Sequence, residues 1–201
     1  QDVTLEAEAG ARIGLLGSTG SGKSTLLDVL YALRTPARGR VEIDGRDYRE
    51  LRLDDLRDQI ALVREPQIFE GTVLDNMRLG REVLSTDRAR EALDEVGLLN
   101  HLLKMPGGVH TAMSTGGAPL SAGQAIQLEL ARALAHEPRV LVLDECLDWL
   151  EDLPERGRLL DLVFGGRERW TVIVASHNAE ILKRCDRVYE IRDGKLTEVT
   201  R

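Results

Sequence analysis

A glycine-rich, polar stretch at residues 17–25, GSTGSGKST, most constrains what this chain can fold into. It follows ARIGLL, an apolar run that predicts a buried strand, and precedes LLDVLYAL, which predicts an amphipathic helix beginning near Lys23. Gly17, Gly22, Lys23 and Ser24 satisfy the pattern G-x-x-x-x-G-K-[ST]. Successive glycines let backbone N–H groups converge on phosphate oxygens, and a helix start favours an anion. The stretch therefore predicts a strand–loop–helix unit that binds phosphate.

Strand and helix patterns alternate along the rest of the chain. The apolar run at 139–145 predicts a central strand that is buried on both faces, and residues 170–176 predict a further strand. Helical spacing dominates from about residue 72 to 136, and the alternating segment 2–10, DVTLEAEAG, predicts a strand with one wet face. We therefore expect an α/β P-loop NTPase fold with a mostly parallel core sheet, an N-terminal antiparallel β portion and an inserted α-helical subdomain at about 72–136.

The composition is typical of one globular domain. The 201 residues suffice for a full hydrophobic core, and no apolar run approaches the roughly 18 residues that a membrane helix needs. The net charge of −7 supplies no basic field, so we expect no nucleic-acid partner. Cys146 and Cys185 are too few for a disulfide framework and favour a reduced, cytosolic setting. The chain does not begin with Met, so we expect it to be part of a longer protein.

Three further motifs place polar residues at the ends of predicted elements. Asp144 and Glu145 end a strand, where Asp144 would hold Mg²⁺ and Glu145 would act as general base, although such a pair also fits a solvated turn. In LSAGQ, Ser121 is a good N-cap and Gly123 permits close backbone approach, although an ordinary capped helix has the same pattern. His177 follows the strand WTVIVAS and can contact a γ-phosphate, although a lone loop histidine often has no role.

The order of these motifs resembles the nucleotide-binding domain of ABC ATPases. LSAGQ matches the family signature LSGGQ with Ala122 in place of the first glycine, and VLVLDE and SH follow in the family's order. The segments LVREPQIFEGTVLDNMRLG and TAMSTGGAPLSAGQ resemble exporter-type members, in which the second faces the transmembrane coupling helices. The resemblance covers nearly the whole chain, so we expect residues 1–201 to be one nucleotide-binding domain that is truncated at its N-terminus.

The resemblance implies a role for each motif toward ATP and Mg²⁺. Ser24 and Asp144 would handle Mg²⁺, Glu145 would be the catalytic carboxylate, and His177 would contact the γ-phosphate. Ser121, Gly123 and Gln124 would contact the γ-phosphate of an ATP bound to the opposite subunit. The residues that would cradle ATP are Gly17, Ser18, Thr19, Gly20, Ser21, Gly22, Lys23, Ser24 and Thr25.

The resemblance also implies a function, with alternatives. The leading hypothesis is an ATPase at the cytoplasmic face of a membrane that powers export. It would dimerise with an identical or a different nucleotide-binding domain and act with transmembrane domains on the same or a separate chain. One alternative is a soluble ABC protein of DNA repair or translation, which usually carries a coiled-coil insertion or tandem cassettes that this sequence lacks. Another is a regulatory ABC ATPase with weak hydrolysis. A GTPase is disfavoured because N-K-x-D is absent, and a small-molecule kinase because it leaves LSAGQ unexplained.

Some positions depart from the family pattern. Arg64 stands where the family has a glutamine that contacts Mg²⁺ and the attacking water, and Gln67, three residues further, would substitute only if the loop shifts its register. Asp148 and Trp149 replace small residues, so we expect an unusual contact between subunits. Arg64 and Asp148 favour the weakly hydrolysing alternative, whereas the intact carboxylate and histidine favour hydrolysis. No aromatic residue is assignable to the family's adenine-stacking position.

Overall fold

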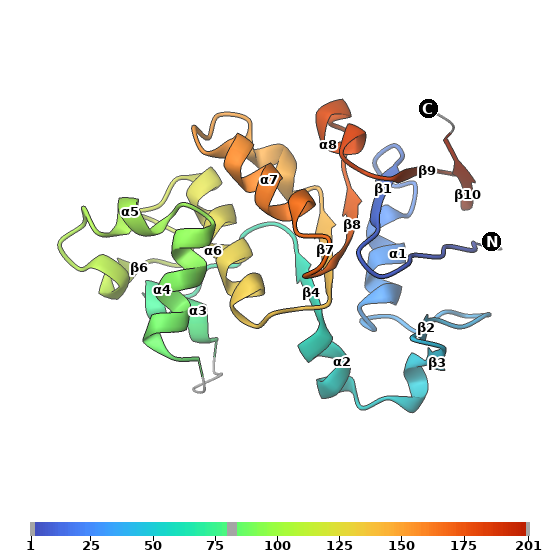
Figure 1. The fold of residues 1–201 in the computed structure, drawn as a ribbon, viewed down its shortest axis with the longest axis horizontal. Helices are drawn as coiled ribbons and strands as arrows, with labels where there is room; N and C mark the ends of the chain where they lie inside the picture. The colour runs from blue at the N-terminus through green and yellow to red at the C-terminus, as the bar shows by residue number, and fades with distance from the viewer. Residues whose placement is uncertain (1–2, 80–83, 200–201) are drawn as a thin grey trace. The chain divides into compact units, whose positions relative to one another are not determined.

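The computed structural model describes residues 3–79 and 84–199. The chain divides into two compact units, and each is considered by itself. Unit 1 comprises Gln1–Leu62, Pro138–Glu145 and Arg167–Arg201, and unit 2 comprises Val63–Glu137 and Cys146–Gly166. Figure 1 labels most of the helices and strands of both units.

Unit 1 is built on a six-stranded sheet with the strand order β10-β9-β1-β8-β7-β4 (Figure 1). The strand β1 pairs in parallel with β8 and β9, and β8 pairs in parallel with β7, whereas β10 runs antiparallel to β9. The strands are β1 (Arg12–Leu16), β4 (Ile60–Val63), β7 (Val140–Asp144), β8 (Thr171–Ala175), β9 (Arg187–Arg192) and β10 (Lys195–Glu198). The mostly parallel α/β sheet that the apolar runs predict is therefore confirmed.

Helix α1 covers one face of this sheet because its apolar side meets the apolar side of the strands. The residues Ile13 and Leu15 are two apart on β1, so they share a face, and Leu27 of α1 joins the same core cluster. Val142 and Ile173 extend that cluster across β7 and β8. The helices of unit 1 are α1 (Lys23–Leu30), α2 (Leu53–Gln59) and α8 (Ala179–Lys183), with a 3₁₀ turn, η1, at Tyr48–Glu50.

The strand predicted over residues 2–10 is wrong for the residues that the structure describes there. Residues 3–8 form no strand and are mostly exposed. Their backbone bonds to side chains instead: Arg187 Nη2 donates to the Glu6 carbonyl over 3.0 Å, and Thr171 Oγ1 donates to the Glu8 carbonyl over 3.4 Å. Alternating polarity indicates that one side of a segment is wet, but a strand also needs a neighbouring strand to pair with.

A small hairpin supplies the antiparallel structure of the first 60 residues. The two-residue strands β2 (Glu42–Ile43) and β3 (Arg46–Asp47) pair antiparallel. Asp44 and Gly45 form the turn with φ values of 50° and 77°, the left-handed region that Asp-Gly turns use. This hairpin is separate from the six-stranded sheet.

Unit 2 is mainly helical. Its longest helix, α6, packs against α3, α4 and the 3₁₀ segment η3. The helical pattern over 86–103 is interrupted, because α4 ends at Glu95 and α5 begins at Leu99, with Gly97 at φ 81° between them. The elements are β5 (Gly71–Thr72), α3 (Val73–Arg78), α4 (Thr86–Glu95), α5 (Leu99–Leu102), η2 (Gly108–His110), β6 (Ala112–Met113), α6 (Ala122–Ala135), η3 (Cys146–Leu150) and α7 (Arg156–Gly165).

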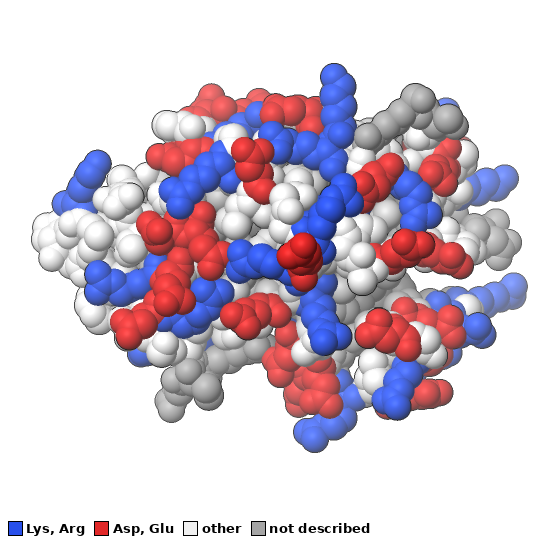
Figure 2. Space-filling view, viewed as in Figure 1, with Lys and Arg blue, Asp and Glu red and all other residues white. Residues whose placement is uncertain are grey.

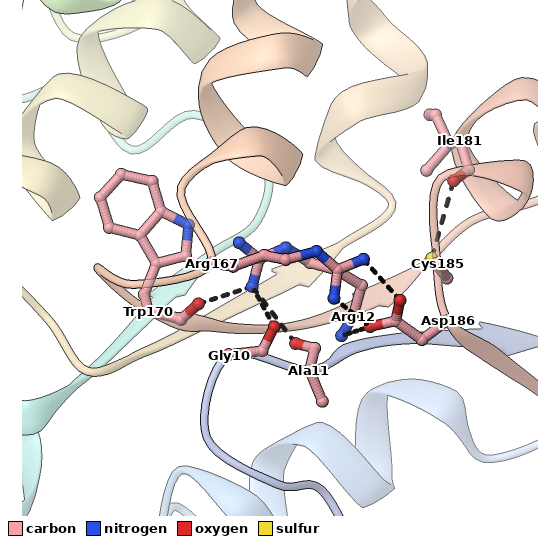
Figure 3. A network of polar contacts seen from close by, with 8 residues as sticks. All are labelled: Gly10, Ala11, Arg12, Arg167, Trp170, Ile181, Cys185 and Asp186. Atoms are coloured by element: carbon pink, nitrogen blue, oxygen red, sulfur yellow. Dashed lines mark hydrogen bonds and ion pairs between the residues drawn. The ribbon is translucent and has the colours of Figure 1, made fainter.

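A fully buried arginine lies at the start of β1 (Figure 3). Arg12 Nη1 donates to the carbonyl oxygens of Trp170 over 2.6 Å and Gly10 over 3.1 Å. Its burial, and after that the nearby Arg167, lower the pKa of the Arg12 guanidinium. The arginine thus ties the segment before β1 to the start of β8.

Asp186 completes this group from the residue before β9 (Figure 3). It accepts from the Arg12 backbone N–H over 2.8 Å and from the two terminal nitrogens of Arg167 over 3.0 and 2.5 Å. The hydrogen bonds from Arg167 are the main cause that lowers the pKa of Asp186. The amino ends of β1, β8 and β9 are therefore connected by charged hydrogen bonds.

The surface of the chain is charged and mixed. On the face drawn in Figure 2, acidic and basic side chains are interspersed. Within residues 3–79 and 84–199, every helix is too short or too polar to cross a lipid bilayer.

Candidate functional site

The glycine-rich loop connects β1 to α1, as the sequence predicts. Gly17 is buried, and a Cβ there would lie 2.6 Å from both the Ile191 carbonyl oxygen and Ser21 Oγ, so only glycine fits. Gly22 is the N-cap of α1 at φ 106°, and no side chain caps the helix there. Because the first N–H groups of a helix lack intrahelical partners, this uncapped end can bind an anion.

Lys23, the first residue of α1, directs its ammonium group back to the loop. Nζ donates to the carbonyl oxygens of Gly17 over 2.5 Å and Ser18 over 3.2 Å. It also lies 3.1 Å from Glu145 Oε1 and 3.4 Å from His177 Nε2. The lysine side chain is only 3% exposed, so its positive charge is buried. It lies where the loop, the end of β7 and the segment after β8 meet.

Ser24 and Asp144 form a pair of oxygen donors beside the lysine. Ser24 Oγ donates to Asp144 Oδ1 over 3.2 Å. Mg²⁺ prefers oxygen ligands and is usually bound by one or two carboxylates together with substrate phosphates and water. In the part of the chain that the structure describes, no cluster of three or more His, Cys, Asp or Glu residues is suited to a metal. The pair therefore fits a magnesium ion that is shared with a phosphate ligand.

Glu145 and His177 come together because β7 and β8 are neighbours in the sheet. Each residue follows the carboxyl end of its strand, where α/β sheets place ligand sites. His177 Nε2 lies 3.3 Å from Glu145 Oε1, and both side chains are about half exposed, at 47% and 44%. A solvent-accessible carboxylate in this place can accept a proton from water.

The sequence motifs did not identify what positions His177. Ser176 is fully buried, and its hydroxyl accepts a hydrogen bond from the Asn178 N–H over 2.9 Å. Asn178 in turn caps α8 by accepting from the Glu180 N–H over 2.9 Å. The histidine is therefore held between two fixed residues. The signal was present in ASHN, because serine and asparagine are residues that cap helices and stabilise turns.

The residues of LSAGQ belong to unit 2 and cap α6. Ser121 Oγ accepts from the Gln124 N–H over 3.3 Å, and Gln124 Oε1 accepts from the Ser121 N–H over 2.9 Å. This reciprocal pair is a capping box, so the predicted N-cap is confirmed. A Cβ on Gly123 would lie 3.2 Å from Leu153 Cδ1, which leaves little room for a side chain. These residues form a group of their own within unit 2.

A buried glutamate of α6 that the sequence motifs did not identify holds the loop containing Gln67. Glu129 Oε1 accepts from the Gln67 N–H over 2.7 Å, and Arg132 Nη1 donates to the Gln67 carbonyl over 3.3 Å. Glu129 and Arg132 also form an ion pair, yet burial raises the pKa of Glu129. Because both backbone groups of Gln67 are bonded, the register shift that would place it at the position of Arg64 requires breaking these contacts.

The loop after Glu145 forms a short 3₁₀ segment, η3. Asp148 and Trp149 lie in η3, and the Trp149 side chain is exposed. The residues of this loop that face inward are apolar, since Cys146, Leu147 and Leu150 are buried.

A family model described as "ABC transporter" matches residues 1–148. The chain belongs to the ABC transporter family. It corresponds to the ATPase domain of that family, as the order of its motifs predicts. The loop, VLVLDE and LSAGQ motifs, which gave the resemblance, all lie within the matched residues.

Individual relatives agree with this assignment. The ABC multidrug transporter MDR1 of Cryptococcus neoformans is 33% identical over 98% of this chain, and P-glycoprotein 14 of Caenorhabditis elegans is 34% identical over 94%. The chain covers 14% of the length of each of these two proteins. The solved structure of a bacterial Atm1-family ABC exporter with ATP bound superposes with a TM-score of 0.86 at 26% identity, over 94% of this chain and 33% of that one. This chain thus spans a small part of the length of these related proteins.

Proposed function

We propose that residues 1–201 form one nucleotide-binding domain, with a helical subdomain at about 72–136, that hydrolyses ATP to power export across a membrane. The observation that carries the proposal is the convergence of Lys23, Ser24, Asp144, Glu145 and His177 in unit 1. An uncapped helix start, a buried ammonium group, an oxygen pair and an accessible carboxylate are the groups that bind a triphosphate and activate water beside it.

In this proposal the loop binds the phosphates. Backbone N–H groups of Gly17 to Thr25 contact phosphate oxygens, and Lys23 neutralises charge on the outer phosphates. Ser24 and Asp144 hold Mg²⁺, which when bound offsets part of the negative charge of the phosphates. The buried setting of Lys23 supports this role, because a charge in a partly desolvated place interacts more strongly than one in water.

Hydrolysis then needs a positioned water. The water oxygen bonds to the γ-phosphorus, the bond from that phosphorus to the β–γ bridging oxygen breaks, and ADP and inorganic phosphate leave. Glu145 accepts the proton of the attacking water, and His177 contacts the γ-phosphate. Their separation of 3.3 Å supports a joint role around one small group.

The proposed partners follow from the family. Ser121, Gly123 and Gln124 of one domain contact the γ-phosphate bound by a second nucleotide-binding domain, so that two domains close over two ATP molecules. The positive end of the dipole of α6, at its N-terminus beside Ser121, supports a role in binding an anion. Transmembrane domains on the same or a separate chain would hold this domain at the cytoplasmic face of the membrane, and the names of its relatives, which are transporters, support this assignment.

The test is Mg–ATP-dependent dimerisation of a variant that cannot turn over. Glu145→Gln removes the proposed base but leaves the loop intact, so size exclusion with Mg–ATP should give a species of twice the mass, while phosphate release falls to background. Glu145→Gln with Ser121→Ala and Gln124→Ala should stay monomeric, because the contact to the opposite ATP is lost. A Glu145→Gln protein that binds ATP yet elutes only as a monomer contradicts the paired arrangement.

A further inference from the structure

The buried ammonium group of Lys23 is already paired with an anion that belongs to the protein. Glu145 Oε1 lies 3.1 Å from Nζ, and the lysine side chain is 3% exposed. Building on the proposed function, in which the loop binds nucleotide phosphates, we propose that the Glu145 carboxylate competes with phosphate for Lys23. Glu145 then sets the affinity for nucleotide, in addition to its proposed part in hydrolysis.

The hydrogen-bonding capacity of Lys23 makes this competition unavoidable. An ammonium group has three N–H donors, and three oxygen acceptors surround Nζ: the carbonyl oxygens of Gly17 and Ser18, and Glu145 Oε1. A phosphate oxygen that contacts Nζ must therefore replace one of them. Because two anions repel each other, the arriving phosphate destabilises the carboxylate beside Lys23 more than it destabilises the neutral carbonyl groups.

Glu145 is the acceptor that is best able to leave. The two carbonyl oxygens belong to the loop itself, at 2.5 and 3.2 Å, and cannot withdraw without changing its backbone. The Glu145 side chain is 44% exposed, so it can rotate into water, which solvates its charge. Rotation about side-chain bonds is enough to break the pair with Lys23.

The backbone of Glu145 stays fixed during such an exchange. Its N–H donates to the Ala175 carbonyl over 2.9 Å, and its φ of 56° lies in the left-handed region that few non-glycine residues adopt. Strained positions of this kind persist only where the surrounding structure holds them, and they gather at functional sites. Displacement by phosphate would thus free the Glu145 carboxylate while the backbone of Glu145 stays beside β8. Nucleotide binding would in this way release the proposed base from its pair with Lys23.

The test is the affinity of the chain for ADP in EDTA, measured by isothermal titration calorimetry. ADP has no γ-phosphate and EDTA removes Mg²⁺, so neither hydrolysis nor a trapped ATP pair contributes. Glu145→Gln keeps the size of the side chain but removes its charge, and its dissociation constant for ADP should fall about five- to tenfold. Glu145→Ala should also bind ADP more tightly, which checks that the glutamine amide itself is not the cause.

Glu168→Gln is the matched control. Glu168 is an exposed residue of unit 1 that precedes β8, at the opposite end of that strand from His177. Its substitution by glutamine removes the same negative charge as Glu145→Gln does. Its ADP affinity should equal that of the unchanged chain. Equal or weaker ADP binding by folded Glu145→Gln and Glu145→Ala overturns the competition. If the unchanged chain and Lys23→Ala bind ADP equally well, the proposed nucleotide site itself fails, which is a separate result.

Discussion

The hydroxyl of Ser24 donates a hydrogen bond to Oδ1 of Asp144 over 3.2 Å, although 120 positions separate the two residues in the sequence. The fold brings them together because α1 packs against β7, with Ser24 in the first turn of the helix and Asp144 at the end of the strand. A hydroxyl oxygen and a carboxylate oxygen that lie this close together are suitable ligands for a small, hard cation.

Asp144→Asn should therefore weaken the binding of the Mg²⁺ that ATP hydrolysis requires. Loss of the charged ligand should raise the Mg²⁺ concentration that gives half the maximal rate. The increase should exceed the about tenfold loss of metal affinity that follows removal of a residue that only supports a metal ligand. The measurement is a Mg²⁺ titration of phosphate release at saturating ATP. Asp152→Asn, an exposed change in the same chain, is the control and should leave the titration unchanged. An unchanged midpoint in Asp144→Asn would remove Asp144 from the metal site.

Lys23→Ala should abolish tight ATP binding. The variant removes the buried positive charge that faces the loop interior, and charge-assisted hydrogen bonds of this kind correspond to about 10- to 100-fold in affinity. Equilibrium binding of a fluorescent ATP analogue measures the loss. Lys195→Ala, which removes an exposed lysine on β10, should bind as the unchanged chain does. Equal affinity in both variants would contradict the assignment of the loop as the phosphate site.

Arg64→Gln should increase the rate of ATP hydrolysis. The resemblance places Arg64 where the family has a glutamine near Mg²⁺ and the attacking water, and a guanidinium is repelled by the metal. Steady-state phosphate release at saturating Mg–ATP compares the two rates. Arg64→Lys keeps the positive charge, so its rate of ATP hydrolysis should equal that of the unchanged chain. A rate that does not change in Arg64→Gln would exclude the idea that Arg64 restrains turnover.

Asp186→Asn should lower thermal stability at neutral pH, and the difference should shrink in acid. Because hydrogen bonds from Arg167 lower the pKa of Asp186 in the folded chain, its ionised form stabilises the fold above the unfolded pKa of about 4. That stabilisation is lost as the pH falls through the lower, folded pKa. Thermal melts at pH 7 and at about pH 3 test the sign, since the difference between the two melting temperatures should be smaller at the lower pH. A constant difference would show that ionisation of Asp186 is not the cause.

The sequence was most informative where burial decides structure. Apolar runs such as VLVLD are covered on both faces, so β7 formed where predicted, and Asp144 and Glu145 followed at its end. It was misleading at residues 2–10, because alternation does not reveal whether a partner strand is present. The helical spacing over 86–103 likewise did not mark the break at Gly97, which depends on a single left-handed φ.

The contacts between distant residues were beyond reach of pattern and spacing. The sequence motifs do not point to Glu129, since nothing local indicates its hydrogen bond to Gln67, 62 positions away. The motifs singled out Lys23, Glu145 and His177, but they did not show that the three side chains lie within 3.1 to 3.4 Å of one another. Such distances depend on strand order, which a single sequence does not reveal.

The carbonyl oxygen of Ile191 occupies the space where any side chain at position 17 would begin. The obstacle is backbone of a neighbouring strand, so no rotamer and no smaller substituent avoids it. A saturation library selected for ATP binding should therefore return a single codon family at position 17. Positions 20 and 22 have open space around a Cβ and should tolerate asparagine at reduced fitness.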